Sequence, residues 1–216
     1  VGGFDTAKSA KLARDKARVS LATDNYVSPI KVTLGDYLTT WITDVYASQL
    51  KPTTLYDYKR VINAYLLPGL GSVKLQDLRP SHIQAFYTDL LTIPNKAGKP
   101  LSPRTVEKTG AVLRKALNYA VNTDGVLTTN PAVKVPTPKG NGTIPTPWSL
   151  TELMTFLDFA KAHRLFFYFR LSAFTGARRG ELLALWWSDF DGTSINLNKS
   201  RTKAGNEVVE QNSTKG

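Results

Sequence analysis

The segment from Phe174 to Trp187, FTGARRGELLALWW, combines two adjacent arginines with a glutamate three residues after the first of them. A guanidinium is a permanent cation whose planar fork of N–H donors matches the oxygens of a phosphate or a carboxylate. Arg178 and Glu181 stand at a spacing where two side chains on a helix meet. The segment therefore predicts an Arg–Glu pair whose remaining guanidinium donors can bind an anion.

The arginines have different positions on a helical wheel drawn through this segment. Arg178 lies inside the apolar stripe, about 40° from Leu182 and about 20° from Leu185, and Arg179 lies at the rim of that stripe. A guanidinium at a core-facing position is costly unless it is paired and hydrogen-bonded. Two interpretations remain open. Arg178 either forms a structural pair with Glu181 that locks the helix, or it binds a phosphate at a cavity wall near a helix N-terminus.

Positive charge is concentrated in one part of the chain. The 216 residues have a formal net charge of +11, and residues 51–115 contain 11 Lys/Arg against 4 Asp/Glu. Such a concentration favours a polyanionic partner, above all nucleic acid. The other interpretation is a basic soluble domain whose charged faces are solvated. The sequence contains no cysteine, which excludes disulfides and thiolate metal sites.

The helix predicted after Lys51 has one apolar and one basic face. Its apolar residues are expected to face the core: Leu55, Tyr58, Ile62, Tyr65 and Leu66. Its first turn and opposite face contain the residues expected to contact DNA phosphates: Thr53, Thr54, Tyr56, Lys59 and Arg60. Hydroxyls and free N–H groups at a helix start suit phosphate contact, and the basic side chains add charge. The segment PGLG at 68–71 is expected to end this helix.

The helix predicted from Pro103 repeats this arrangement, with Ser102 as its N-cap. Its buried stripe is expected to contain Val106, Leu113, Leu117 and Ala120. Its candidate DNA-contacting residues are Ser102, Arg104, Thr105, Lys108, Arg114 and Lys115. Few carboxylates are expected on either basic face, which favours DNA contact over a solvated surface. Phosphate contacts carry no base information, so the pattern names no target sequence.

The remaining segments predict a mainly α fold with a small β-hairpin. No strand pattern is present before residue 133, which predicts a compact helical domain of four main helices. Residues 136–147 are rich in Pro and Gly, as linkers are. After them come a capping box at Ser149 and Glu152, an apolar segment RLFFYFRLSAFTG expected to be a buried central helix, and a hairpin formed by TSINLNKS and EVVEQN around an AGN turn.

The pattern TGARRGELLALWWSDFD at 175–191 resembles the first active-site motif of the tyrosine recombinase (phage integrase) family, T-G-x-R-x-x-E-x-x-x-L-x-W-x-D-[IVF]-D. The matching positions are Thr175, Gly176, Arg178, Glu181, Leu185, Trp187, Asp189, Phe190 and Asp191. The preceding helical segments are also similar to those of the family. The resemblance implies a mechanism in which a tyrosine attacks a DNA phosphate and forms a 3′-phosphotyrosyl link. Arginines stabilise the pentavalent phosphate, and a lysine protonates the 5′-oxygen leaving group.

The same resemblance implies a domain order. Residues 1–28 would be the tail of an arm-binding domain with a linker helix, and residues 29–135 a helical core-binding (SAM-like) domain. Residues 136–147 would be the linker, and residues 148–216 the first part of an α+β catalytic domain. The family places its catalytic lysine in the turn between the second and third strands of a small sheet.

Carried over to this sequence, the resemblance makes Arg178 the first catalytic arginine and Glu181 its supporting acid. Lys215, in an STKG segment expected to form that turn, is the better candidate for the lysine, and Lys203 is the second. Arg179 and Lys203 are also candidate DNA contacts. The later H-x-x-R motif of the family is absent, and none of the nine tyrosines follows Arg178. The chain is therefore expected to bind DNA without cleaving it alone.

The expected partners follow from this resemblance. They are double-stranded DNA at attachment or core sites and, for a full-length protein, further copies in a tetramer. No cofactor or metal is expected. No membrane contact is expected either, since no apolar run approaches the roughly 18 residues of a membrane span. The expected location is the bacterial cytoplasm. A non-catalytic DNA-binding regulator or a competing truncation product is the alternative. An RNA-binding helical protein is a third, weaker interpretation.

Overall fold

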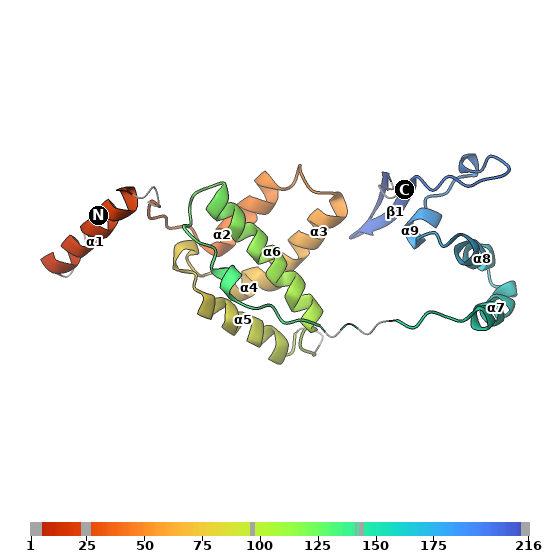
Figure 1. The fold of residues 1–216 in the computed structure, drawn as a ribbon, viewed down its shortest axis with the longest axis horizontal. Coiled ribbons are helices and arrows are strands. Elements are labelled where there is room, and N and C mark those ends of the chain that lie inside the picture. The colour runs from red at the N-terminus through yellow and green to blue at the C-terminus, as the bar shows by residue number, and fades with distance from the viewer. Residues whose placement is uncertain (1–5, 23–26, 96–97, 141, 143–144, 213–216) are drawn as a thin grey trace. The chain divides into compact units, whose positions relative to one another are not determined.

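The structure is a computed structural model that describes residues 6–22, 27–95, 98–140, 142 and 145–212. The chain packs as two compact units. One consists of Val1–Gln49 with Tyr58–Gly140, and the other of Leu50–Asp57 with Asn141–Gly216. Figure 1 labels the α-helices of both units and strand β1. The N-terminal helix α1 spans Ala7–Ala22, and the Thr6 hydroxyl accepts the Ser9 backbone N–H at 3.2 Å, as expected of its N-cap.

Four main helices form the helical bundle, as the sequence predicts (Figure 1). They belong to the first unit except for the start of the second helix, which is grouped with the second unit up to Asp57. The first is α2, which continues into a π-helical turn, and the second runs without interruption through α3, a second π-helical turn and α4. Their bounds are Leu34–Thr40 for α2, Trp41–Val45 for its extension, Pro52–Val61 for α3, Ile62–Leu66 for the second π turn, Leu67–Leu70 for α4, Pro80–Thr92 for α5 and Pro103–Asn122 for α6.

Side-chain caps begin two of these helices, and the one at Ser102 is the cap that the sequence predicts. At α2, Thr33 Oγ1 accepts the Asp36 backbone N–H at 3.1 Å, and Asp36 Oδ2 accepts the Thr33 backbone N–H at 3.3 Å. At α6, Ser102 Oγ accepts the Thr105 backbone N–H at 3.3 Å. Each cap satisfies a donor that the first helical turn leaves without a partner.

The second helix ends within the PGLG segment, as the sequence predicts, but it first continues through Pro68. Proline has no N–H and usually interrupts a helix because it removes one backbone hydrogen bond. Here the π-helical turn precedes the proline, and the Leu67 N–H donates to the Ile62 carbonyl five residues back. This wider turn accommodates the proline, and the helix ends only after Leu70, with Gly71 as its C-cap.

The core of the first unit is formed by apolar side chains from all four helices. The largest fully buried ones are Trp41, Tyr87, Leu34, Leu38, Ile62, Leu66, Leu75, Ile83, Leu113, Leu117, Val61 and Val106. The predicted stripe of α6 is therefore confirmed. On the second helix the core face contains Val61, Ile62 and Leu66, whereas Tyr58 and Tyr65 are only half-buried. The π turn adds a residue to one helical turn, which rotates the wheel relative to a regular α-helix.

From Asn141 on, the described residues of the second unit form three α-helices, two 3-10 turns (Ala160–Ala162 and Trp187–Asp189) and a hairpin. The α-helices and strands are α7 (Leu150–Phe159), α8 (Phe166–Thr175), α9 (Arg179–Leu182), β1 (Lys199–Ala204) and β2 (Glu207–Asn212). The predicted capping box begins α7, with the Ser149 N–H donating to Glu152 Oε2 at 2.7 Å. The strands pair antiparallel from Lys199↔Asn212 to Ala204↔Glu207. β1 thus begins later than the alternating segment around Ile195 predicts, since Ile195 forms only an isolated bridge with Phe190.

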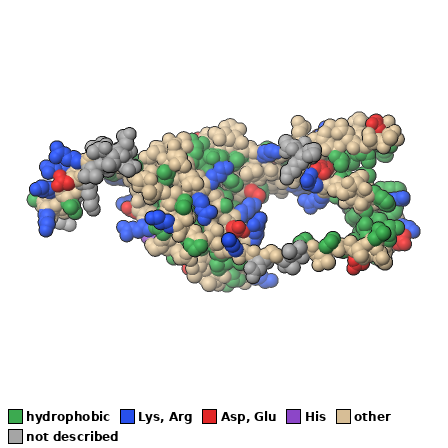
Figure 2. Space-filling view, viewed as in Figure 1, with side chains coloured by type: hydrophobic (Ala, Val, Ile, Leu, Met, Phe, Trp, Pro, Cys, Tyr) green, Lys and Arg blue, Asp and Glu red, His purple; other side chains and the backbone are tan. Residues whose placement is uncertain are grey.

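Helix α8 is exposed, although its composition predicts a buried central helix. Phe167 is 79% exposed and Phe174 70% exposed, and none of the residues of α8 is buried. Figure 2 shows hydrophobic side chains gathered over the part of the molecule that contains α7 and α8. The expectation is wrong for the described residues, because few of them pack over these faces. The buried apolar side chains described in this unit are Leu157, Ala160, Leu182 and Ala184.

Candidate functional site

Arg178 lies just before a helix and not inside one. Gly176 has a left-handed conformation (φ 64°) that ends α8, and Arg178 is extended (φ −68°, ψ 148°) as the N-cap of the four-residue helix α9. The prediction that Arg178 occupies the core-facing stripe of a helix is therefore wrong. Its side chain is 65% exposed. A guanidinium at the cap remains in contact with water and avoids the cost of burial.

Glu181 holds Arg178 at two points, as the three-residue spacing predicts. Its Oε2 accepts the Arg178 backbone N–H at 2.8 Å, and its Oε1 accepts Nη1 of the guanidinium at 2.9 Å. The Glu181 side chain is only 8% exposed, so the anchor is rigid while the cation faces solvent. One guanidinium nitrogen is thus used for positioning. The Arg178 side chain as a whole is 65% exposed, so its guanidinium remains accessible to an oxyanion.

Helix α9 packs directly on strand β1. A Cβ on Gly180 would collide with the Ser200 hydroxyl and would lie 3.1 Å from the Arg201 carbonyl oxygen. Gly180 therefore allows the close approach of the segment that begins at Arg178. Within β1, the Arg201 guanidinium is paired with Glu210 at 2.7 Å.

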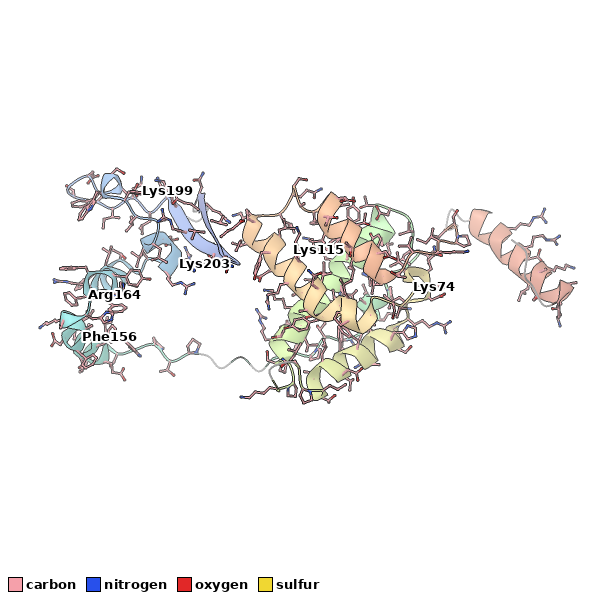
Figure 3. All side chains as sticks on the ribbon, turned by 180° about the vertical axis from the view of Figure 1, so that it is seen from behind. Lys74, Lys115, Phe156, Arg164, Lys199 and Lys203 are labelled. Carbon is pink, nitrogen blue, oxygen red and sulfur yellow. The ribbon has the colours of Figure 1, made fainter. Side chains whose placement is uncertain are left out.

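Only one of the two lysine candidates lies among the described residues. Lys203 is exposed on β1 opposite Val208, within the strand and not in the turn. Lys215 lies outside the described residues. Arg179 is exposed as the first residue of α9. In the view of Figure 3, Lys199 and Lys203 are both labelled on the hairpin, and Lys199 Nζ lies 3.8 Å from Asp189 Oδ1.

The basic face of α3 is arranged as its wheel predicts. Tyr56, Lys59 and Arg60 are exposed, and Thr53 and Thr54 are half-buried in the first turn. The arrangement presents charge and hydroxyl groups along one helix surface. Figure 2 shows Lys and Arg side chains on the visible surface of the helical bundle.

The polar side chains at the start of α6 are less available to bind an anion than the sequence predicts. The Ser102 hydroxyl is within 3.0 Å of the Thr105 hydroxyl and accepts the Thr105 backbone N–H, so both residues are already engaged in the cap. Arg104 is paired with Glu107 at 2.9 Å, although few carboxylates were expected on this face. Both side chains of this pair are exposed, and exposed pairs are worth little, so a phosphate can displace the carboxylate at small cost.

Arg114 and Lys115 are less exposed than Lys108. Both are half-buried. The Lys115 ammonium lies over two tyrosine rings, 4.8 Å from the ring centre of Tyr46 and 5.5 Å from that of Tyr58. The wheel of α6 places Lys115 with the exposed residues, because a wheel takes no account of a neighbouring helix that covers the same face.

Sequence reasoning missed Tyr46 and assigned Tyr58 to the core. A period of 3.6 residues separates the two faces of one helix, but it does not show which side chains of another helix lie above a face. The only local signal is the aromatic content of the segments that flank the basic residues.

Burial raises the pKa of the Tyr87 hydroxyl, and the charge of Arg114 acts in the opposite direction.

Two kinds of feature are absent from the part of the chain that the structure describes. Within it, no group of three or more His, Asp or Glu side chains is arranged to hold a metal ion. No helix in the same ranges has the length and apolar content needed to cross a membrane.

Residues 33–91 match the family model described as phage integrase, N-terminal SAM-like domain. A protein named tyrosine recombinase XerC-like, from Caldanaerobacter subterraneus subsp. tengcongensis, is 34% identical over 171 residues. The match covers 74% of this chain and 41% of that protein, so the chain spans less than half the length of this relative.

Two solved structures share the fold. The lambda integrase tetramer bound to a Holliday junction has 20% identity and a TM-score of 0.62, with 98% of this chain and 62% of that chain covered. The Tn1549 transposon integrase in complex with circular intermediate DNA has 18% identity and a TM-score of 0.67, with coverages of 84% and 59%. At these identities the similarity establishes the fold of the chain.

Proposed function

The chain belongs to the tyrosine recombinase family, and from this premise we propose that it acts in site-specific DNA recombination as part of an integrase. The complete enzyme, which carries this chain together with the rest of the catalytic domain, cleaves and rejoins duplex DNA through a 3′-phosphotyrosine. The observation that carries the proposal is the Arg178 guanidinium, which is held by a buried carboxylate on a side chain that is 65% exposed. A pre-positioned cation of this kind stabilises the negative charge that develops on a phosphate in the transition state.

In this proposal Arg178 holds the scissile phosphate and Glu181 keeps the guanidinium in place. A lysine protonates the 5′-oxygen as it leaves, and Lys215 is preferred for this role over Lys203. An ammonium near other cations has a lowered affinity for its proton, which suits a general acid. Arg179 contributes a phosphate contact beside the active site.

The helical unit supplies DNA affinity in this proposal. The basic faces of α3 and α6 contact phosphates of a core-site duplex through the candidate residues on those helices. Residues 29–135 form the core-binding domain, 136–147 the linker, 148–216 the first part of the catalytic domain, and 1–28 the end of an arm-binding domain. The complete enzyme assembles as a tetramer on two duplexes in the bacterial cytoplasm, where its DNA substrate is found; lambda integrase, which shares the fold, is a tetramer on a Holliday junction.

A suicide DNA substrate tests the catalytic part of the proposal. No tyrosine follows Arg178 in the sequence, so residues 1–216 should bind a core-site duplex and form no covalent adduct with it. The complete enzyme should form the adduct on the same substrate. A covalent complex with residues 1–216 alone would show that another side chain acts as the nucleophile and would overturn the assignment.

A salt series tests the DNA-binding part. Binding through several phosphate contacts should weaken steeply as salt rises, with a slope of about −0.9 per phosphate in a plot of log K against log salt. An affinity for duplex RNA equal to that for duplex DNA, or no binding to either, would contradict the proposed role of the helical unit.

A further inference from the structure

The side chain of Lys115 is enclosed by aromatic rings from two other helical segments. Its ammonium lies over the rings of Tyr46 and Tyr58. Trp41 contacts both rings, with centroid distances of 4.6 Å to Tyr46 and 6.3 Å to Tyr58. We refer to Trp41, Tyr46, Tyr58 and Lys115 as the aromatic–lysine cluster. Figure 3 labels Lys115 within the helical bundle.

The Lys115 ammonium is not neutralised within the described residues, where it faces rings and forms no ion pair with a carboxylate. An aromatic face attracts a cation through its quadrupole, but it carries no negative charge that would compete with an anion. Lys115, Tyr46 and Tyr58 are each half-buried, so the rings cover part of the lysine and leave part accessible to solvent. The cluster therefore presents a partly desolvated, uncompensated positive charge at the surface.

The cluster lies where α6 contacts α3. Lys115 follows Lys108 by seven residues, which places both on the same side of α6. Tyr58 belongs to α3, and its ring centre lies 5.5 Å from the Lys115 ammonium. The ammonium therefore lies beside α3, the helix that also carries the exposed basic residues Lys59 and Arg60.

We propose that Tyr46 and Tyr58 are positioning residues that hold Lys115 ready to bind a phosphate of duplex DNA. The proposal rests on the DNA binding proposed above and adds a pre-formed phosphate contact to it. A lysine on an open surface loses side-chain entropy when a phosphate fixes it. The two rings restrict Lys115 before DNA arrives, so less entropy is lost on binding. Partial desolvation also strengthens the attraction between the ammonium and the phosphate.

The charge is tested with Lys115→Met in residues 1–216, by measuring duplex DNA binding over a salt series. Affinity at low salt should fall roughly five- to tenfold, as expected for one desolvated ionic contact. The slope of log K against log salt should become shallower by about 0.9. Lys74→Met is the matched control, since Lys74 is an exposed lysine outside both basic faces, and it should leave the slope unchanged. An equal change in both variants would overturn the proposal.

The positioning role is tested with ring variants. Tyr46→Leu and Tyr58→Leu should each weaken DNA binding several-fold, whereas Tyr46→Phe and Tyr58→Phe should retain it, because phenylalanine keeps the cation–π contact. In a Lys115→Met background the Leu variants should cause no further loss. A further loss of the same size would overturn the positioning role, since the rings would then act independently of the lysine.

Thermal melting separates these effects from folding, and the Phe variants keep the test valid if a Leu variant does not fold. The proposal would be overturned if the Lys115→Met variant melts at a lower temperature but binds DNA as well as the unchanged chain. The cluster would then be structural. If the unchanged chain fails to bind duplex DNA, the proposed function itself fails. If the chain binds and Lys115→Met binds equally well, only this inference fails.

Discussion

Arg178 donates two hydrogen bonds to one buried carboxylate, from its backbone N–H and from its guanidinium. The backbone bond fixes the residue as the N-cap of α9, and the side-chain bond fixes the direction of the cation. Arg179, its neighbour, is also exposed but lies inside the helix. The described contacts therefore anchor Arg178, whereas Arg179 is exposed at the start of α9. We propose the anchored guanidinium as the pre-organised phosphate site.

At this scale we expect Arg178→Lys in the complete enzyme to abolish detectable strand cleavage and leave DNA affinity nearly unchanged. Lysine retains the charge but has neither the planar fork nor the simultaneous contact with Glu181 and a phosphate. Cleavage is measured with the suicide substrate and affinity with a gel shift. Arg179→Lys is the matched control and should cleave at close to the normal rate. Normal cleavage by Arg178→Lys would mean that the Arg178–Glu181 pair is only structural.

Helix α9 and strand β1 form the element that supports this arginine. Their contact depends on Gly180, because any side chain there meets Ser200 and approaches the Arg201 carbonyl. β1 is in turn paired with β2 along six residue pairs, and the Arg201–Glu210 ion pair spans the two strands. The short helix has no extended hydrogen-bonded body of its own, so its orientation is set by this packing.

We expect Gly180→Ala to destabilise the second unit by about 1–3 kcal/mol, the usual cost of overpacking a tight contact. Chemical denaturation followed by the fluorescence of Trp186 and Trp187 measures the effect. Gly142→Ala serves as the control, since a Cβ at Gly142 meets nothing within 4 Å, and it should be neutral or slightly stabilising.

A second variant localises the Gly180 effect. Ser200→Ala removes the nearest hydroxyl, so the pair Gly180→Ala with Ser200→Ala should recover part of the lost stability. The Arg201 carbonyl remains 3.1 Å from the added methyl, which keeps the recovery incomplete. Full stability in Gly180→Ala alone would show that α9 does not depend on close packing against β1.

The two units of the chain bury very different amounts of apolar side chain. The first has a continuous core built from four helices, whereas the buried apolar residues described in the second are Leu157, Ala160, Leu182 and Ala184. Large apolar side chains remain exposed in the second unit, among them Phe159 at 88% and Trp187 at 93%. Burial of apolar surface is the main favourable term in folding, so the first unit has the larger source of stability.

We therefore expect the two units of residues 1–216 to differ in amide hydrogen exchange. Amides in the middle of α6 should exchange only through global opening of the first unit, while those of α7 and α8 should exchange orders of magnitude faster. Exchange followed by mass spectrometry of peptic fragments resolves the two. Equal protection of α6 and α8 would contradict this expectation. In the complete enzyme, protection of α8 should rise if the added residues cover its exposed phenylalanines.

Several features of the fold could be predicted because they depend on residues close together in sequence. The caps at Thr33, Ser102 and Ser149 satisfy donors of the next turn, and the hairpin turn follows from the AGN segment between two strands. The hydrophobic stripe of α6 also follows from its period alone. The Arg178–Glu181 pair belongs to the same group, since the two residues are three apart.

Only the tertiary structure decided which side chains from different helices and segments contact each other. The wheel made Arg178 a buried helical residue, but the left-handed Gly176 ends α8 and places it at an exposed cap. The wheel made Lys115 an exposed cation, but two rings from other helical segments cover it. The sequence by itself determined which side chains are candidates for phosphate chemistry. The tertiary structure decided which of them are anchored, because anchoring requires partners whose proximity no local period encodes.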